Sequence, residues 1–154
     1  MNLLNTFFIV CAKYLFVFPP VLILWVFLKA SAIQRRNLLI RSLMVLVVGV
    51  LLAKIGGLLY YEQRPFIAHH TIPLIPHVDD NGFPSDHTLL VFACAFLIAP
   101  FSLSASIIAV AMASLVAIGR IGTGLHSTLD ILASIAFAAT ANWLAWLISK
   151  IHDR

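Results

Sequence analysis

Six polar side chains in this sequence have the residue types that phosphoryl transfer requires, and they lie in three short polar segments of an otherwise apolar chain. The set consists of Arg64, Ser85, His87, Arg120, His126 and Asp130. Arginine binds phosphate oxygens through two parallel hydrogen bonds, and histidine can attack or move protons near neutral pH. One such arginine alone is equally well explained as an interfacial anchor. Two arginines, two histidines and an aspartate together favour a functional site.

The third segment contains the most specific spacing. His126 and Asp130 are four residues apart, so a helix that starts near His126 turns both side chains to one face. The carboxylate can then accept a hydrogen bond from one imidazole nitrogen, which orients the ring and leaves the other nitrogen free to attack. This arrangement indicates phosphoryl transfer through a phosphohistidine.

The second segment predicts an anion site at the start of a helix. Ser85 follows a proline and precedes an apolar helix, so it is expected at the N-cap, where backbone N–H groups are free to bind an anion. His87 lies in the first turn, close to any anion held there. Asp86 suits the helix dipole but repels phosphate, so we expect its side chain to point away or to pair with an arginine.

The composition predicts a membrane protein. Of the 154 residues, 62% are hydrophobic and only 10% are charged, whereas a soluble domain has about 25% charged residues. The net charge of +4 comes from residues at the ends of apolar segments, which argues against nucleic-acid binding. Cys11 and Cys94 lie in apolar runs and are expected to be buried thiols. The N-terminus lacks a basic region and a cleavage site, so we expect no removable signal peptide.

The apolar stretches predict an all-α integral membrane protein with a bundle of about five transmembrane helices in a single domain, residues 1–154. Pro19 and Pro20 predict a kink in the first span, and Pro100 divides an uncharged run that is too long for one helix. The third span is short. The expected spans are 7–28, 38–61, 86–99, 104–120 and 127–151.

Charge predicts the orientation of these spans. The strongest basic cluster, Lys29, Arg35, Arg36 and Arg41, connects the first two spans, and the positive-inside rule places this connection in the cytoplasm. Counting spans from there brings all three polar segments to the opposite, outer face.

The three polar segments, in this order, resemble the signature motifs of the type 2 phosphatidic acid phosphatase superfamily, which also includes the vanadium haloperoxidases. The family motifs are Lys-x6-Arg-Pro, Pro-Ser-Gly-His and Ser-Arg-x5-His-x3-Asp, and the corresponding residues here are Arg64-Pro65, Pro84-Ser85-Asp86-His87 and Arg120-x5-His126-x3-Asp130. The resemblance implies that His126 is the nucleophile, Asp130 orients it and His87 is the general acid. Arg64, Arg120, Ser85 and the amides around Asp86 would bind phosphate, with no metal or cofactor.

The chain departs from the family pattern at three positions. The family lysine should occupy position 57, which is Gly57, while Lys54 lies one turn earlier; it either extends along the helix toward the site or is unrelated to it. The glycine of the second motif is Asp86. The serine before Arg120 is Gly119, which removes one hydrogen bond.

With Gly57 in place of the family lysine and Asp86 in place of the glycine, the chain resembles the bacitracin-resistance type of undecaprenyl pyrophosphate phosphatase within this superfamily. That resemblance implies hydrolysis of undecaprenyl pyrophosphate to undecaprenyl phosphate and inorganic phosphate at the outer face of the bacterial cytoplasmic membrane. The expected partners are the lipid phosphate and the bilayer. A phosphatase of phosphatidylglycerophosphate, phosphatidic acid or lipid A is the alternative.

Two other classes remain open: a small transporter with a histidine relay, and a non-enzymatic membrane protein. A transporter is expected to place ionisable residues near the middle of its spans, and only Lys13 and Lys54 approach that depth. A further polar group in the longest loop has three interpretations: a solvated loop, a contact with the substrate head group, or a divalent metal site. Its members are His69, His70, His77, Asp79 and Asp80.

Overall fold

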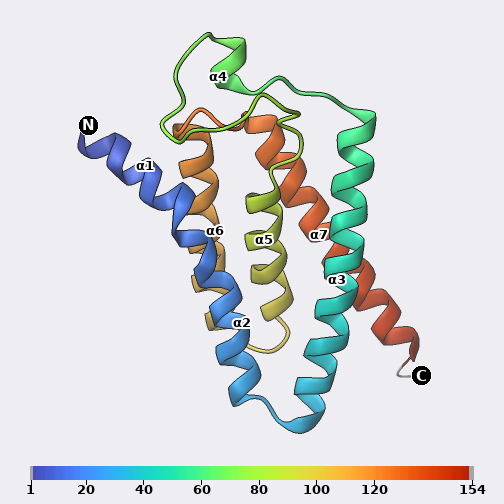
Figure 1. The fold of residues 1–154 in the computed structure, drawn as a ribbon. Helices are drawn as coiled ribbons and strands as arrows, with labels where there is room; N and C mark the ends of the chain where they lie inside the picture. Colours follow the sequence, from blue (N-terminus) through green and yellow to red (C-terminus); the bar gives the residue numbers. More distant parts are fainter. Residues whose placement is uncertain (1, 153–154) are drawn as a thin grey trace.

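The protein is a bundle of apolar helices, as the sequence predicts, and the computed structural model describes residues 2–152 (Figure 1). Within that range there is no β-strand, and one isolated bridge joins Gln63 and Asn81. In chain order the elements are α1 (Leu3–Lys13), the 3₁₀ helix η1 (Leu15–Val17), α2 (Phe18–Lys29), α3 (Ala32–Leu59), α4 (Pro65–Ala68), α5 (Asp86–Ile98), α6 (Leu103–Gly122) and α7 (Thr128–His152).

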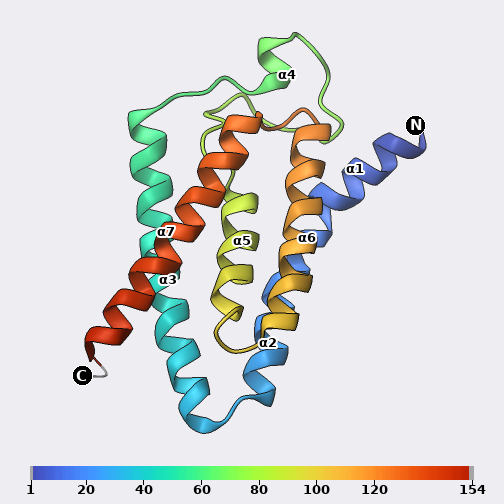
Figure 2. The same ribbon diagram turned by 180° about the vertical axis from the view of Figure 1, so that it is seen from behind.

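Among residues 2–152, four units are long and apolar enough to cross a membrane: the α1–α2 unit, α3, α6 and α7. With 13 residues, α5 is shorter; it spans about 20 Å, whereas the hydrocarbon core of a bilayer is about 30 Å thick. It lies in the middle of the bundle and contacts α2, α3, α6 and α7 (Figures 1 and 2). The start of α5 is therefore recessed below the ends of its neighbours, which makes room for a site there.

The prolines divide the first span where the sequence predicts a kink. α1 ends at Lys13, η1 follows, and α2 begins at Phe18 with Pro19 and Pro20 in its first positions. A proline is tolerated there because the first amides of a helix have no acceptor within it.

The basic stretch expected to connect the first two spans lies largely within a helix, because α3 begins at Ala32. Ser31 and Gln34 form a capping box at its start. Arg35 donates hydrogen bonds to the carbonyls of Phe27, Leu28 and Ala30 at the end of α2. The sequence pattern places these polar residues outside a helix, but here they satisfy the unpaired backbone groups of two helix ends.

The long polar segment between α3 and α5 folds over one end of the bundle and contains the short helix α4, which the sequence does not predict (Figure 1). The amide of Phe66 donates to Gly124 O at 3.1 Å, and the amide of Leu74 donates to Thr123 O at 3.1 Å. These bonds tie the segment to the α6–α7 turn, so that the three polar segments meet.

Gly119 explains one departure from the family pattern. A Cβ at this position would lie 2.6 Å from the backbone nitrogen of Ala12 and 2.8 Å from the Cβ of Cys11. A serine would therefore collide with α1. The glycine permits α1 to lie against α6 immediately before Arg120, so its role here is close helix packing.

Candidate active site

The six predicted residues come together at the end of the bundle that carries α4. Arg64 precedes α4, Ser85 and His87 lie at the start of α5, and Arg120 lies in the last turn of α6. His126 occupies the α6–α7 turn, and Asp130 lies in the first turn of α7. Buried residues among them are Arg64, Ser85, Arg120, His126 and Asp130.

The imidazole of His126 is held at one nitrogen and open at the other. Its Nδ1 lies 2.9 Å from Gly82 O and 3.3 Å from Asp130 Oδ2. A backbone carbonyl can only accept, so Nδ1 carries the hydrogen, and Nε2 keeps its lone pair. This Nε2 lies 3.2 Å from Arg120 Nη2 and 3.5 Å from Arg64 Nη1. The lone pair thus accepts from Arg120 and faces two guanidinium groups that can hold a phosphate in front of it.

The surroundings of His126 keep the ring neutral. Burial lowers the pKa of His126 below its ordinary value of 6.5, and the positive charges of Arg120 and Arg64 lower it further, while the hydrogen bond to Asp130 opposes this change. The ring is only 3% exposed. The neutral form, which can attack phosphorus, therefore predominates at neutral pH.

Asp130 is fixed by the start of α7. Its Oδ2 accepts from the amide of Ser127 at 2.8 Å, and its own amide donates to Ser127 Oγ at 3.2 Å. These reciprocal bonds pair two amides that the helix itself leaves free. The carboxylate is completely buried, so its orientation toward His126 is set by the local fold, as the spacing of four residues predicts.

Ser85 occupies the N-cap position of α5, as predicted, but its hydroxyl makes no capping hydrogen bond. Ser85 Oγ is buried without a partner among the described residues, and so is Arg120 Nε. The carbonyl of Ser85 accepts from Ser134 Oγ at 3.0 Å, which anchors this turn to α7. Unpaired buried donors are rare in folded proteins, and these two belong to residues of the predicted site, one of which, Arg120, contacts His126 through its Nη2.

The ring of His87 is held by packing. It lies edge-on to Phe16 of η1, with 5.1 Å between the ring centroids. It is within electrostatic range of Arg120 and His126, and it is only partly buried. The position suits a group that exchanges protons with a bound substrate and with solvent.

Arg64 has an acidic partner in the loop. Its Nε forms an ion pair with the half-exposed carboxylate of Asp80, and its Nη1 donates to Leu125 O at 3.0 Å. The guanidinium lowers the pKa of Asp80 below its ordinary value. Asp80 therefore belongs to the site, whereas His69 and His70 are exposed. Within residues 2–152, no group of three or more His, Cys, Asp or Glu side chains is placed to hold a metal ion.

Comparison with known proteins agrees with the motifs. The model of the PAP2 superfamily matches residues 38–153 of this chain. The chain belongs to the PAP2 superfamily. With the family comes the class of activity: this PAP2 protein is a membrane lipid phosphatase.

Two relatives align with nearly all of the chain. It is 34% identical to "Bacitracin transport permease protein BcrC" of Bacillus licheniformis, over 99% of this chain and 77% of the relative. It is 27% identical to "Undecaprenyl-diphosphatase BcrC" of Bacillus subtilis, over 97% of this chain and 77% of the relative. These matches confirm the resemblance to the bacitracin-resistance type.

A solved structure shows the same fold. The crystal structure of a transmembrane PAP2-type phosphatidylglycerolphosphate phosphatase from Bacillus subtilis superposes with a TM-score of 0.54 and 17% identity. The similarity covers 96% of this chain and 84% of the other.

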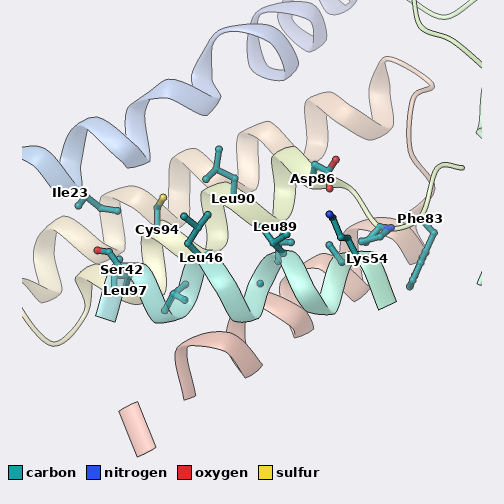
Figure 3. A pocket seen from close by; sticks show the side chains of 16 residues that line it. Ile23, Ser42, Leu46, Lys54, Phe83, Asp86, Leu89, Leu90, Cys94 and Leu97 are labelled. Carbon is teal, nitrogen blue, oxygen red and sulfur yellow. The ribbon is translucent and has the colours of Figure 1, made fainter. Parts of the chain in front are cut away.

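In this PAP2 protein, the side chains of Asp86 and Lys54 lie outside the cluster around His126. Both are exposed and line one end of a groove between α3 and α5, beside Phe83 and Pro84 (Figure 3). Asp86 therefore points away from the donors around His126, which is one of the two orientations expected for it.

Two residues of the site, Asn81 and Gly82, are not predicted from the sequence. Asn81 Nδ2 donates to the carbonyls of Gly57 and Tyr60 at 3.0 and 2.9 Å, and its Oδ1 accepts from the amides of Glu62 and Phe83, both at 3.0 Å. These four bonds fix the turn whose carbonyl, at Gly82, holds His126. An Asn-Gly pair is typical of turns, and its place just before Phe83-Pro84-Ser85 is the signal in the sequence.

Proposed function

We propose that this PAP2 protein hydrolyses undecaprenyl pyrophosphate to undecaprenyl phosphate and inorganic phosphate through a phosphohistidine on His126. The observation that carries the proposal is the unprotonated Nε2 of His126, 3.2 Å from Arg120 and 3.5 Å from Arg64. The choice of lipid is supported by the relative named an undecaprenyl-diphosphatase and by the sequence motifs.

In the first step, Nε2 of His126 attacks the terminal phosphorus, and the bond from that phosphorus to the bridging oxygen breaks. The bridging oxygen leaves on the lipid monophosphate and takes a proton from His87. Asp130 and the Gly82 carbonyl stabilise the positive charge that develops on the imidazole. Arg64, Arg120 and Ser85 bind the oxygens of the transferred group, whose charge they stabilise in a water-poor pocket.

In the second step, water attacks the phosphohistidine on phosphorus. His87, now neutral, accepts one proton of that water, and the bond between phosphorus and Nε2 breaks. Inorganic phosphate leaves, and His126 returns to its neutral form with the hydrogen still on Nδ1. The sum of the two steps is one water consumed and one phosphate released, with every protein group restored.

We place the site at the outer face of a bacterial cytoplasmic membrane, in a single domain with five spans. The support is the distribution of charge. Lys29, Arg35, Arg36 and Lys150 lie at helix ends opposite the end that carries α4 (Figure 1). Basic residues favour the cytoplasmic side, so the active site lies on the other side.

The test is hydrolysis by purified protein of undecaprenyl pyrophosphate, phosphatidic acid and phosphatidylglycerol phosphate in matched detergent micelles. We expect the pyrophosphate to have the highest kcat/KM. A preference for phosphatidic acid or phosphatidylglycerol phosphate would refute the substrate, and no phosphate release from any of the three would refute the reaction. Activity should persist in excess chelator, and a requirement for added Mg²⁺ would contradict the mechanism.

The intermediate has its own test. His126→Ala should abolish phosphate release, by at least about a thousandfold, because no other group provides the attacking atom. Substrate labelled in its terminal phosphate should transfer an acid-labile label to wild-type protein during turnover and none to His126→Ala. Full activity of the folded variant would eliminate His126 as the nucleophile.

A further inference from the structure

A pocket lies at the end of the bundle opposite the phosphate site. It has a volume of about 440 Å³ and is formed by the first turns of α3, the end of α7 and the turn that joins α5 to α6. This turn contains Pro100 and Phe101, and it does not reach as far as the start of α3, because α5 has only 13 residues (Figures 1 and 2). The short α5 therefore leaves space at this end of the bundle as well.

Three cations line this pocket: Arg36, Arg41 and Lys150. Within residues 2–152, none of the three takes part in an ion pair shorter than 4.0 Å. The acidic residues of the same range all lie at the end that carries α4: Glu62, Asp79, Asp80, Asp86 and Asp130. The described part of the chain thus gives this pocket three positive charges and no carboxylate to balance them.

Arg41 is held in the pocket with its hydrogen bonding incomplete. The side chain is partly buried, and its Nε is buried without a partner among the described residues. The guanidinium lies over the ring of Phe101, 5.8 Å from the ring centre. Arg41 is the tenth residue of α3, about 14 Å along the helix axis from its start. A cation held at that depth without an anion is costly, so the pocket is suited to a ligand that carries negative charge.

The rest of the lining indicates which kind of anion fits. Ile40, Met44 and Ile148 provide apolar walls, and Trp146 lies beside Lys150, whose Nζ is 4.2 Å from the centre of the indole ring. A free phosphate gains nothing from apolar walls, whereas a phospholipid carries a phosphate and an acyl chain next to each other. Because α3 and α7 are long and apolar enough to cross a membrane, the lipid of the leaflet at this end is the adjacent source of such a molecule.

We propose that this pocket binds an anionic phospholipid of the leaflet opposite the active site. Its phosphate binds Arg36, Arg41 and Lys150, and the start of one acyl chain lies along Ile40 and Met44. A zwitterionic head group fits less well, because its ammonium group adds a fourth cation to the pocket. The lipid joins α3 to α7 and to the α5–α6 turn, so its binding stabilises the fold. The inference is independent of the proposed reaction, since none of the six residues of the candidate site lines this pocket.

Phosphatidylglycerol is the probe, because its phosphate is a diester and so lacks the terminal phosphate that the proposed reaction removes. Native mass spectrometry of the delipidated full-length protein in detergent should show one bound phosphatidylglycerol, with a Kd at least about tenfold below that of phosphatidylcholine. Saturating phosphatidylglycerol should raise the midpoint of thermal unfolding by about 5 °C. Inorganic phosphate at the same concentration should not raise it. Equal stabilisation by phosphate would overturn the lipid assignment, and equal binding of phosphatidylcholine would overturn the role of charge.

Arg41→Gln tests the guanidinium. It should raise the Kd for phosphatidylglycerol about tenfold, because a charged hydrogen bond is lost. Without lipid, the variant should unfold at the same temperature as wild type or higher, since it removes an unpaired cation. A side chain that only packs would not show this reversal. A variant that is less stable than wild type without lipid and binds phosphatidylglycerol equally well would overturn the proposal.

Two further variants separate this pocket from the general positive charge of the same end. Lys150→Gln, at an exposed position, should weaken binding of phosphatidylglycerol several-fold without affecting the fold. Lys29→Gln is the matched control, because it removes one positive charge at the end of α2 and does not line the pocket. It should bind phosphatidylglycerol as wild type does. Equal losses from Lys29→Gln and from the two pocket variants would show that the lipid responds only to overall charge, and would overturn the site.

Discussion

The two sides of the phosphate site differ in how completely their polar atoms are paired. On the side formed by the α6–α7 turn, His126 Nδ1 and Asp130 Oδ2 are joined to each other and to backbone groups of Gly82 and Ser127, and Asp130 Oδ1 is the one polar atom of these two side chains without a partner among the described residues. On the side formed by the start of α5 and the end of α6, Ser85 Oγ and Arg120 Nε have no protein partner. His126, the proposed nucleophile, is thus oriented before substrate arrives, and two groups proposed to bind the phosphate oxygens are left open.

Because of this difference, the two sides of the site should contribute differently to the stability of the fold and to turnover. A buried polar atom left unpaired costs about 1–3 kcal/mol, so the open side destabilises the folded protein until an anion binds. The paired side should contribute to both folding and turnover. Variants on the two sides should therefore change stability and activity in different proportions.

Among substitutions that leave His126 in place, the largest effect is expected from Asp130→Asn on the paired side. The amide keeps the shape of the carboxylate but does not neutralise the positive charge that forms on His126, so kcat should fall about a hundredfold. Turnover of undecaprenyl pyrophosphate measures the loss, and circular dichroism verifies the helical fold. A kcat close to that of wild type would show that the orientation of His126 does not depend on the charge of Asp130.

The pH profile of kcat/KM tests the state of His126 in the free enzyme. Because burial lowers the pKa of His126 below 6.5, the neutral form predominates at pH 7 and is lost as the pH falls through the lowered pKa. Below that point the rate should fall about tenfold per pH unit. Asp130 opposes the lowering, so Asp130→Asn should move this acidic limb to still lower pH. A limb above pH 6.5 would contradict the described environment.

Asn81→Ala should disrupt the hydrogen bonds of the paired side indirectly. The Gly82 carbonyl would lose the turn that aims it at His126, so kcat should fall about tenfold, with little change in KM. The acidic limb should also move down, since this carbonyl stabilises the protonated ring. Asn142→Ala is the control, because Asn142 donates to Ala138 O on α7, far from the site. If both variants lower thermal stability alike and neither moves the pH profile, Asn81 is only structural.

Ser85→Ala should have the smallest effect on activity, and it should not destabilise the fold. It removes a buried hydroxyl without a partner, so the free energy of unfolding should stay the same or rise by up to about 1 kcal/mol. KM should rise about fivefold as one phosphate contact is lost. Ser134→Ala removes a hydroxyl that donates to Ser85 O and Asp130 O, and it should destabilise the fold. A stability loss from Ser85→Ala as large as that from Ser134→Ala would refute the distinction between the two sides.

The local parts of the fold follow directly from the sequence. Apolar runs of spanning length become helices because their backbone groups pair within the segment. The pairing of His126 with Asp130 follows from the helical period. The three polar segments lie at one end of the bundle because successive spans alternate in direction. Helix α3 begins before the expected span because the polar residues Ser31, Gln34 and Arg35 bind the backbone of two helix ends.

Contacts between segments that are distant in the sequence could not be predicted from its local pattern. The bond from His126 to the Gly82 carbonyl joins residues 44 apart, and no local period encodes which carbonyl of a loop will meet a ring. The same holds for the pairing of Asp80 with Arg64, for the four bonds of Asn81, and for the packing of α1 on Gly119.

The sequence by itself therefore determined a helical membrane protein with the residues and spacing of a phosphatase. The tertiary structure decided which nitrogen of His126 carries the hydrogen, which donors are left unpaired, and which loop carbonyl meets the ring. The physical reason is that helix periodicity acts within a few residues, whereas hydrogen-bond pairing and the space between helices depend on how whole segments pack.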